Sequence, residues 1–86
     1  MSAKFFTDED GKTNVEARFI IDPEGYRWFL ADGRIRMWEA ECDGEIDPKE
    51  NGYPAHNWRR AIEVLNEYGY IDCPFEDIDW QEGTLS

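Results

Sequence analysis

Residues 15–41 read VEARFIIDPEGYRWFLADGRIRMWEAE, and this pattern is typical of an antiparallel sheet. Over residues 15–21, apolar side chains occupy every second position, which is the period of a strand with one buried face. Residues 22–25, DPEG, predict a tight turn, because the proline presets φ and the glycine supplies a positive φ. The chain is therefore expected to reverse direction after the first strand, at this turn.

Two further strands are predicted beyond the turn. Residues 26–30 (YRWFL) and residues 35–41 (IRMWEAE) are rich in the aromatic and branched side chains that strands favour. Between them, Asp32 and Gly33 form a dipeptide that strongly favours a two-residue hairpin turn. Residues 14–41 are therefore expected to form a three-stranded antiparallel meander.

A helix is predicted over residues 54–68, PAHNWRRAIEVLNEY. Pro54 suits the first turn of a helix, and Gly69 is a typical residue for its C-terminal end. Apolar side chains recur at helical spacing and form one stripe, at Trp58, Ala61, Ile62 and Leu65. We expect Trp58, Ile62 and Leu65 to pack on one face of the meander, which gives an α+β arrangement. The sheet residues expected beneath the helix are Val15, Phe19, Ile21, Trp28, Leu30, Ile35 and Met37.

The remaining segments are expected to complete a single small acidic domain over residues 1–86. A chain of this length has room for one modest hydrophobic core. Residues 1–13 are expected to form a polar N-terminal arm, and residues 72–86 an acidic and aromatic tail. Residues 70–73 are either an extended segment or a fourth strand of the sheet.

The net charge is −11, from 20 acidic and 9 basic residues, and it is unevenly distributed. Residues 1–38 hold 7 acids and 6 bases, whereas residues 39–86 hold 13 acids and 3 bases. Such a charge repels nucleic acids and anionic membranes and attracts basic surfaces. Because 41% of the residues are hydrophobic and 15% are aromatic, the chain is too apolar to be disordered.

Neither a signal peptide nor a membrane span is predicted. The sequence begins MSAKFFTDED, and no apolar run approaches the roughly 20 residues that cross a bilayer. We therefore expect a cytoplasmic protein without membrane contacts. In that compartment Cys42 and Cys73 are expected to be reduced thiols.

The residues that could support catalysis or bind a metal are few. His56 is the sole histidine, and no serine lies between Ser2 and Ser86. Alternating carboxylates could collect Ca²⁺ or Mg²⁺, but they do not match the calcium-binding loop of EF-hands. These carboxylates belong to Glu39, Glu41, Asp43, Glu45 and Asp47. We expect no enzyme, no cofactor and no metal site, with a carboxylate-based divalent-metal protein as one alternative.

The outward face of the predicted meander suggests a second alternative, a module that binds nucleic acid directly. Arginine and aromatic side chains on an open sheet face can hold a single strand by stacking and charge. The residues expected on this face are Arg18, Ile20, Arg27, Phe29, Arg34, Arg36 and Trp38. We favour a different interpretation, because nucleic-acid binding depends on positive charge. In it, the arginines pair with carboxylates while Phe29 and Trp38 form a second small core under the terminal segments.

The acidic clusters indicate the function that we expect. Residues 39–53 carry six acids and one base, and residues 72–86 carry five acids and no base, with aromatic residues between them. Charge of this kind accelerates association with a basic surface, and aromatic side chains supply affinity. The alternative is that the acidity only keeps the chain soluble.

We therefore expect a non-enzymatic inhibitor that mimics nucleic acid and blocks a basic, nucleic-acid-binding surface of a partner protein or nucleoprotein complex. Viral inhibitors of nucleases, or of CRISPR-type or restriction-type defence complexes, have this size and charge. The expected partner contacts are Glu39, Glu41, Asp43, Glu45, Asp47, Asp72, Glu76, Asp77, Asp79 and Trp80. No direct contact with nucleic acid is expected, and an open sheet edge would allow a homodimer.

Overall fold

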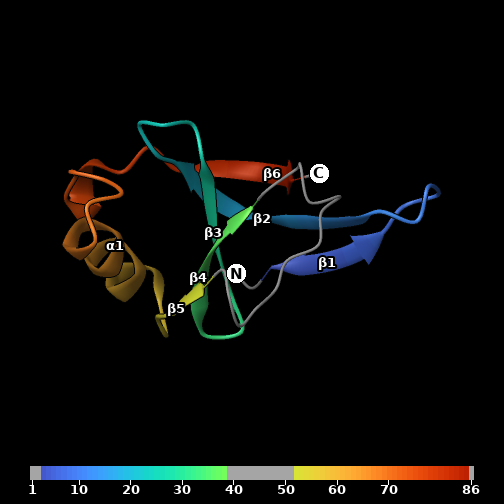
Figure 1. Ribbon diagram of the computed structural model, residues 1–86, viewed down its shortest axis with the longest axis horizontal. Helices are drawn as coiled ribbons and strands as arrows, with labels where there is room; N and C mark the ends of the chain where they lie inside the picture. Colours follow the sequence, from blue (N-terminus) through green and yellow to red (C-terminus); the bar gives the residue numbers. More distant parts are fainter. Residues whose placement is uncertain (1–2, 39–51, 86) are drawn as a thin grey trace.

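The computed structural model describes residues 3–38 and 52–85, and it shows an α+β fold in which one helix packs on a curled antiparallel sheet (Figure 1). The meander is formed by β2 (Thr13–Ile21), β3 (Arg27–Ala31) and β4 (Arg34–Trp38). Its predicted course is confirmed as far as Trp38. Residues 39–41, expected to end the third strand, lie outside the described residues.

The two turns of the meander have the geometry that their sequences predict. Asp32 and Gly33 both adopt positive φ, 53° and 71°, as a two-residue hairpin turn with right-handed strand twist requires. At the other turn, Gly25 has a φ of 91°. There the buried Asp22 carboxylate accepts hydrogen bonds from the backbone nitrogens of Glu24 and Tyr26, each at 2.9 Å. The turn is therefore held by a side chain as well as by its backbone.

The sheet is larger than the three or four strands that the sequence predicts, because the described residues form six. The additional strands are β1 (Lys4–Thr7), β5 (Gly52–Pro54) and β6 (Gln81–Leu85). The predicted N-terminal arm thus contains β1, and the predicted tail contains β6. Residues 70–73 are not a strand. The predicted strand count was too low because β6 pairs with β2 through residues that lie 62–70 positions apart in the sequence.

The long strand β2 organises both ends of the chain. Val15 lies opposite Phe5 of β1 and Leu85 of β6, and Phe19 lies opposite Phe29 of β3 and Gln81 of β6. Because a strand has only two edges, β6 runs along one edge of β2, while β1 and β3 share the other edge at its two ends. The sheet curls around β2 as a result.

The helix α1 (Trp58–Glu67) is shorter than predicted. Its N-cap is Asn57, whose side-chain oxygen accepts a hydrogen bond from the backbone nitrogen of Arg60 at 2.8 Å. Pro54 ends β5 instead of beginning the helix, because the cap at Asn57 fixes the first turn. Gly69, with a φ of 80°, follows the end of the helix as expected.

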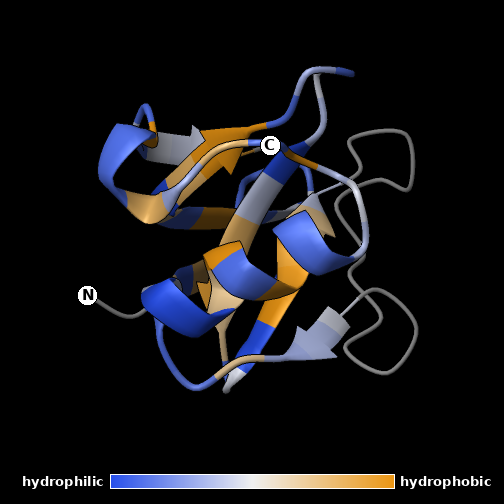
Figure 2. Cartoon of the chain, turned by 90° about the vertical axis from the view of Figure 1, so that its left-hand side faces the viewer, coloured by the Kyte–Doolittle hydropathy of each residue, from blue (hydrophilic) through white to orange (hydrophobic). Residues whose placement is uncertain are grey.

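A cluster of apolar side chains, here called the helix-side cluster, fills the space between α1 and the sheet. Its buried members include Ile62 and Leu65 of α1 and Ile20, Trp28 and Ile35 of the sheet. Figure 2 shows that hydrophilic residues of α1 face the viewer, away from this cluster. Leu30 and Met37 pack against it as predicted.

A second cluster lies on the opposite face of the sheet and is formed by Val15, Phe29, Ala31, Trp38 and Leu85. The predicted core beneath the terminal segments is therefore confirmed. In β1, the ring of Phe5 packs edge to face on that of Phe29, with the ring centres 6.0 Å apart. One part of the helix-side prediction was wrong: Val15 and Phe19 belong to the second cluster, and Ile21 is 53% exposed. The residue of β2 that reaches the helix side is Ile20.

Candidate functional site

The predicted contact residues divide into two groups. Glu39, Glu41, Asp43, Glu45 and Asp47 lie outside the described residues. The remaining five are carried by residues 72–82, here called the acidic segment, which connects α1 to β6. Its carboxylates are exposed and belong to Asp72, Glu76, Asp77, Asp79 and Glu82, whereas Trp80 is half-buried. The segment contains five acidic residues and no basic residue.

The acidic segment is fastened to the helix by one side chain, Asn66. Its amide nitrogen donates to the backbone oxygens of Ile62, at 2.9 Å, and Cys73, at 2.8 Å. Its amide oxygen accepts from the backbone nitrogen of Cys73 at 3.1 Å. Two of these hydrogen bonds fix Cys73, and with it the start of the acidic segment, against α1, and the third holds the Asn66 side chain to its own helix. The sequence offered a weak signal for this role, because asparagine is uncommon within helices unless it bonds locally.

Aromatic side chains fix the rest of the segment. The ring of Trp80 packs edge to face on Trp58 of α1 and on Phe75, with ring centres 5.0 Å and 5.6 Å apart. Each ring is only partly buried, so one part packs on the helix-side cluster while another part faces solvent. Phe75 lies in η2 (Phe75–Asp77), a single turn of 3₁₀ helix that carries two of the carboxylates. Aromatic anchors and acidic groups are thus interleaved.

Two arginines lie over these rings. The guanidinium carbon of Arg59 is 4.4 Å from the centre of the Phe75 ring, and that of Arg18 is 5.3 Å from the centre of the Trp80 ring. Both distances allow attraction between the cation and the ring face. Arg18 also pairs with Glu82 at 3.4 Å, and Arg59 approaches Glu76 at 3.8 Å. The surface therefore already binds guanidinium groups of its own chain.

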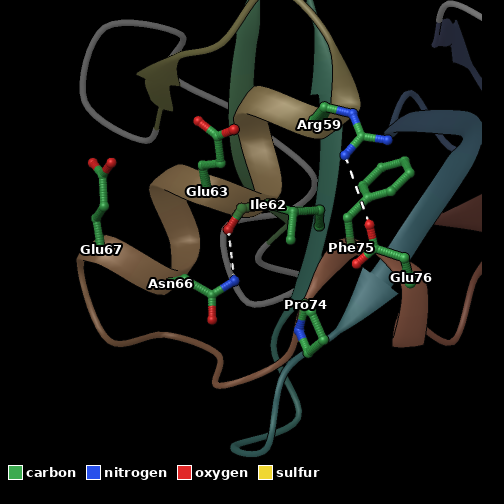
Figure 3. Close-up of a pocket in the computed structure, with 8 residues that line it drawn as sticks. All are labelled: Arg59, Ile62, Glu63, Asn66, Glu67, Pro74, Phe75 and Glu76. Atoms are coloured by element: carbon green, nitrogen blue, oxygen red, sulfur yellow. Dashed lines mark hydrogen bonds and ion pairs between the residues drawn. The ribbon is translucent and has the colours of Figure 1, made fainter.

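A groove of about 420 Å³ separates α1 from the acidic segment (Figure 3). Figure 3 shows Glu63 and Glu67 side by side on α1, with Arg59 reaching over the Phe75 ring toward Glu76. Ile62, which is 2% exposed, forms part of the apolar floor. The residues that line the groove are Arg59, Ile62, Glu63, Asn66, Glu67, Pro74, Phe75 and Glu76.

The surface around this groove is strongly negative. Residues 58–85 hold seven acidic residues and two arginines, which gives a net charge of −5. Arg60 donates hydrogen bonds to Glu63 at 3.0 Å and to Glu67 at 3.3 Å. The hydrogen bond to Glu63 and the charge of Glu67 raise the pKa of this guanidinium. Asp72, Asp77 and Asp79 make no ion pair with any described residue, so their charges remain available. Sequence alone does not mark Glu63 and Glu67 as site residues, because Arg59 and Arg60 formally neutralise them.

A second aromatic group lies at the C-terminal end of α1. The rings of Tyr53 and Tyr68 stack with centres 4.6 Å apart, and the hydroxyl groups of Tyr53 and Tyr70 are 2.7 Å apart. This hydrogen bond, together with burial, raises the pKa of Tyr53. These side chains join β5 to the C-terminal end of the helix. The ring of Trp28, in the sheet, packs on that of Tyr70 with the ring centres 4.8 Å apart.

The sheet face expected to present arginine and aromatic side chains is covered. Phe29, Trp38 and Arg36 are buried in the second cluster or beside it. Arg36 pairs with Asp32 at 3.3 Å. These three side chains therefore do not form an exposed platform for stacking bases.

The described residues offer little for catalysis or metal binding. Across residues 3–38 and 52–85, no three His, Cys, Asp or Glu side chains lie close enough to share a metal ion. His56 is exposed just before the N-cap of α1. Cys73 forms no disulfide with a described residue, and Cys42 lies outside them. In the same part of the chain, no helix has the length and apolar composition needed to cross a bilayer.

Comparisons of this chain with protein-family models, with curated proteins and with solved structures found no match. Its function is therefore inferred from geometry and charge. The described surface combines fixed carboxylates, partly exposed aromatic rings and one groove.

Proposed function

We propose that this chain is a non-enzymatic binding protein that occupies a basic, nucleic-acid-binding surface of a partner protein and so blocks it. The observation that carries the proposal is the acidic segment, residues 72–82. It holds five carboxylates and no cation, and it is fixed to α1 by Asn66 and by the contact of Trp80 with Trp58. A charged surface held in one shape gives up little conformational freedom when it binds.

The charge of the segment gives the partner its chemistry. Proteins that bind nucleic acid place lysine and arginine where phosphates lie, and those cations supply much of the affinity. Exposed carboxylates at Asp72, Asp77 and Asp79 would compete for the same cations. The net charge of −5 over residues 58–85 would also accelerate the encounter with a positive surface.

The aromatic rings distinguish this proposal from acidity that serves only solubility. A solubilising surface needs charge alone, and it gains nothing from large rings that remain partly exposed. Here Phe75 and Trp80 lie among the carboxylates with part of each ring in solvent. Partly exposed aromatic side chains, tryptophan above all, commonly supply much of the affinity of protein interfaces.

A capture experiment with competing nucleic acid tests the proposal. The wild-type chain is immobilised beside the variant D72N/E76Q/D77N/D79N and the control E9Q/D10N/E16Q/E24Q, which removes the same number of charges from exposed positions elsewhere. Each is incubated with a lysate of the host cells, and bound proteins are eluted with double-stranded DNA and identified by mass spectrometry.

The wild type and the control are expected to retain a nucleic-acid-binding protein that DNA or raised salt releases, and the variant is expected to lose it. The proposal is wrong if the variant retains the same protein as strongly as the control. It is also wrong if DNA displaces nothing from the wild-type chain.

A further inference from the structure

The groove between α1 and η2 has an apolar floor and carboxylate walls. Ile62 lies at the floor, Glu63 and Glu67 line the helix wall, and Glu76 lines the opposite wall. The volume of about 420 Å³ is at the small end of the roughly 300–1,000 Å³ that ligand pockets span. The groove therefore suits one long side chain better than a larger ligand.

The carboxylates of the groove are incompletely used within the described residues. A single nitrogen of Arg60, Nη1, serves both Oε2 of Glu63 and Oε1 of Glu67. The second oxygen of each carboxylate has no hydrogen bond from a described residue. Arg59 approaches Glu76 at 3.8 Å, which is too long for a hydrogen bond. Both walls therefore have acceptors for further donors.

The spacing of these acceptors favours a guanidinium over a metal ion. No three acidic side chains among the described residues lie close enough to share one ion. A guanidinium carries five N–H donors in a planar fork, so it can bridge carboxylates that are further apart. The surface already holds a guanidinium of its own chain, because the guanidinium carbon of Arg59 lies 4.4 Å from the centre of the Phe75 ring.

We propose that this groove receives an arginine side chain from a basic segment of the partner, with the aliphatic stem against Ile62 and Pro74 and the guanidinium on the free oxygens of Glu63 and Glu67. This inference rests on the proposed function, because it names the anchor through which the acidic surface would hold a basic partner. Lysine fits less well, since its compact ammonium group cannot bridge separated carboxylates.

The first measurement is a titration of the isotope-labelled chain with hexa-arginine amide, followed by amide NMR spectra at low ionic strength. The largest shift changes are expected at the groove residues of α1 and at residues 74–76. Hexa-lysine amide carries the same charge and is expected to bind about threefold more weakly.

Two pairs of variants locate the site. E63Q/E67Q is expected to weaken hexa-arginine binding about fivefold, whereas E9Q/D10N, with the same charge change in the β1–β2 turn, is expected to change it less than about twofold. That turn lies at the opposite end of the molecule from α1 (Figure 1). R60Q frees both glutamates and is expected to tighten binding about twofold, and K12Q is its charge-matched control in the same distant turn.

The outcomes separate the groove from the wider acidic surface. Shift changes at the groove, with binding that is weaker in E63Q/E67Q and tighter in R60Q, support the inference. Shift changes spread over all acidic residues, or equal weakening by the two double variants, would overturn the groove while leaving the proposed function intact. No binding to any part of the chain at low ionic strength would overturn the groove together with the cation-binding surface. If E63Q/E67Q fails to fold, the comparison of R60Q with K12Q decides the matter, because only R60Q is expected to tighten binding.

Discussion

The two apolar clusters lie on opposite faces of one sheet, yet they are assembled in different ways. The helix-side cluster centres on α1, whose apolar stripe can be recognised from the spacing of residues over three helical turns, although Ile71 beyond the helix also belongs to it. The second cluster unites Val15 with Leu85, and Ala3 packs against it, so it depends on both ends of the chain. A helix carries its own periodic signal, whereas a cover made of terminal strands depends on pairing that local sequence does not specify.

The strand β3 carried a signal for the second cluster. Its apolar residues Trp28, Phe29, Leu30 and Ala31 are consecutive, which is the pattern of a strand buried on both faces. In the structure Trp28 and Leu30 face the helix, and Phe29 and Ala31 face the second cluster. A strand with one solvated face would have alternated instead.

The largest expected effect tests whether the second cluster stabilises the fold as much as the first. Phe29→Ala removes a ring that is 0% exposed, and it is expected to lower the free energy of unfolding by about 3–5 kcal/mol. Leu65→Ala, in the helix-side cluster, is the comparison, with an expected loss of about 2–5 kcal/mol. Urea unfolding measures both. A loss below about 1 kcal/mol for Phe29→Ala would show that the second cluster is not a true core.

A smaller effect is expected at the turn between β2 and β3, which is bonded to Trp28 of the helix-side cluster. The Asp22 carboxylate accepts from the indole nitrogen of Trp28 at 3.0 Å and from two backbone nitrogens of the turn. Asp22→Ala leaves these donors unpaired and is expected to cost about 2 kcal/mol. Glu24→Ala, at an exposed position of the same turn, is expected to stay within about 0.5 kcal/mol. Equal losses in urea unfolding would mean that the carboxylate does not hold the turn.

The cap of α1 concerns the helix side alone. Asn57→Ala removes the acceptor for the backbone nitrogen of Arg60 and is expected to cost about 1 kcal/mol. His56→Ala changes the exposed preceding residue and is expected to alter stability by less than about 0.5 kcal/mol. Thermal unfolding compares the two variants. If His56→Ala lowers the stability more than Asn57→Ala does, the helix begins before Trp58, closer to the start at residue 54 that the sequence predicts.

Local chemistry explains which features the sequence revealed. The turn at Asp32 and Gly33 and the helix stop at Gly69 are predictable because positive φ restricts the choice of residue. The strands β1 and β6 were not predictable, because residues 4–7 and 81–85 are short and carry no alternating apolar pattern, and they form strands only by pairing with β2.

The candidate site follows the same division. The carboxylates of the acidic segment are plain in the sequence, since their charge needs no tertiary structure. The groove cannot be recognised in the sequence, because its second wall is positioned by the hydrogen bonds between Asn66 of the helix and Cys73. Glu63 and Glu67 become part of it for the same reason, although sequence alone pairs them with arginines.

The smallest expected effect distinguishes the clusters by their response to pH. The hydrogen bond between the hydroxyl groups of Tyr53 and Tyr70 raises the pKa of Tyr53 above its ordinary value of 10.0. A tyrosine whose pKa is higher in the folded state stabilises the fold below about pH 10 and loses this contribution as the pH rises through the folded value. Tyr70→Phe is therefore expected to lower the pKa of Tyr53 toward 10.0 and to cost about 0.5–1 kcal/mol at neutral pH.

NMR of labelled tyrosine ring carbons follows this titration residue by residue, and Tyr26→Phe, at an exposed position outside the group, is its control. The described members of the second cluster carry no titratable side chain, so alkaline pH should first loosen the contact of β5 with α1 and leave Phe29 and Leu85 packed. If the Tyr53 titration is the same in Tyr70→Phe and Tyr26→Phe, the hydroxyl pair does not couple β5 to the helix. The difference between the two faces would then lie in their assembly alone, because both would respond to pH in the same way.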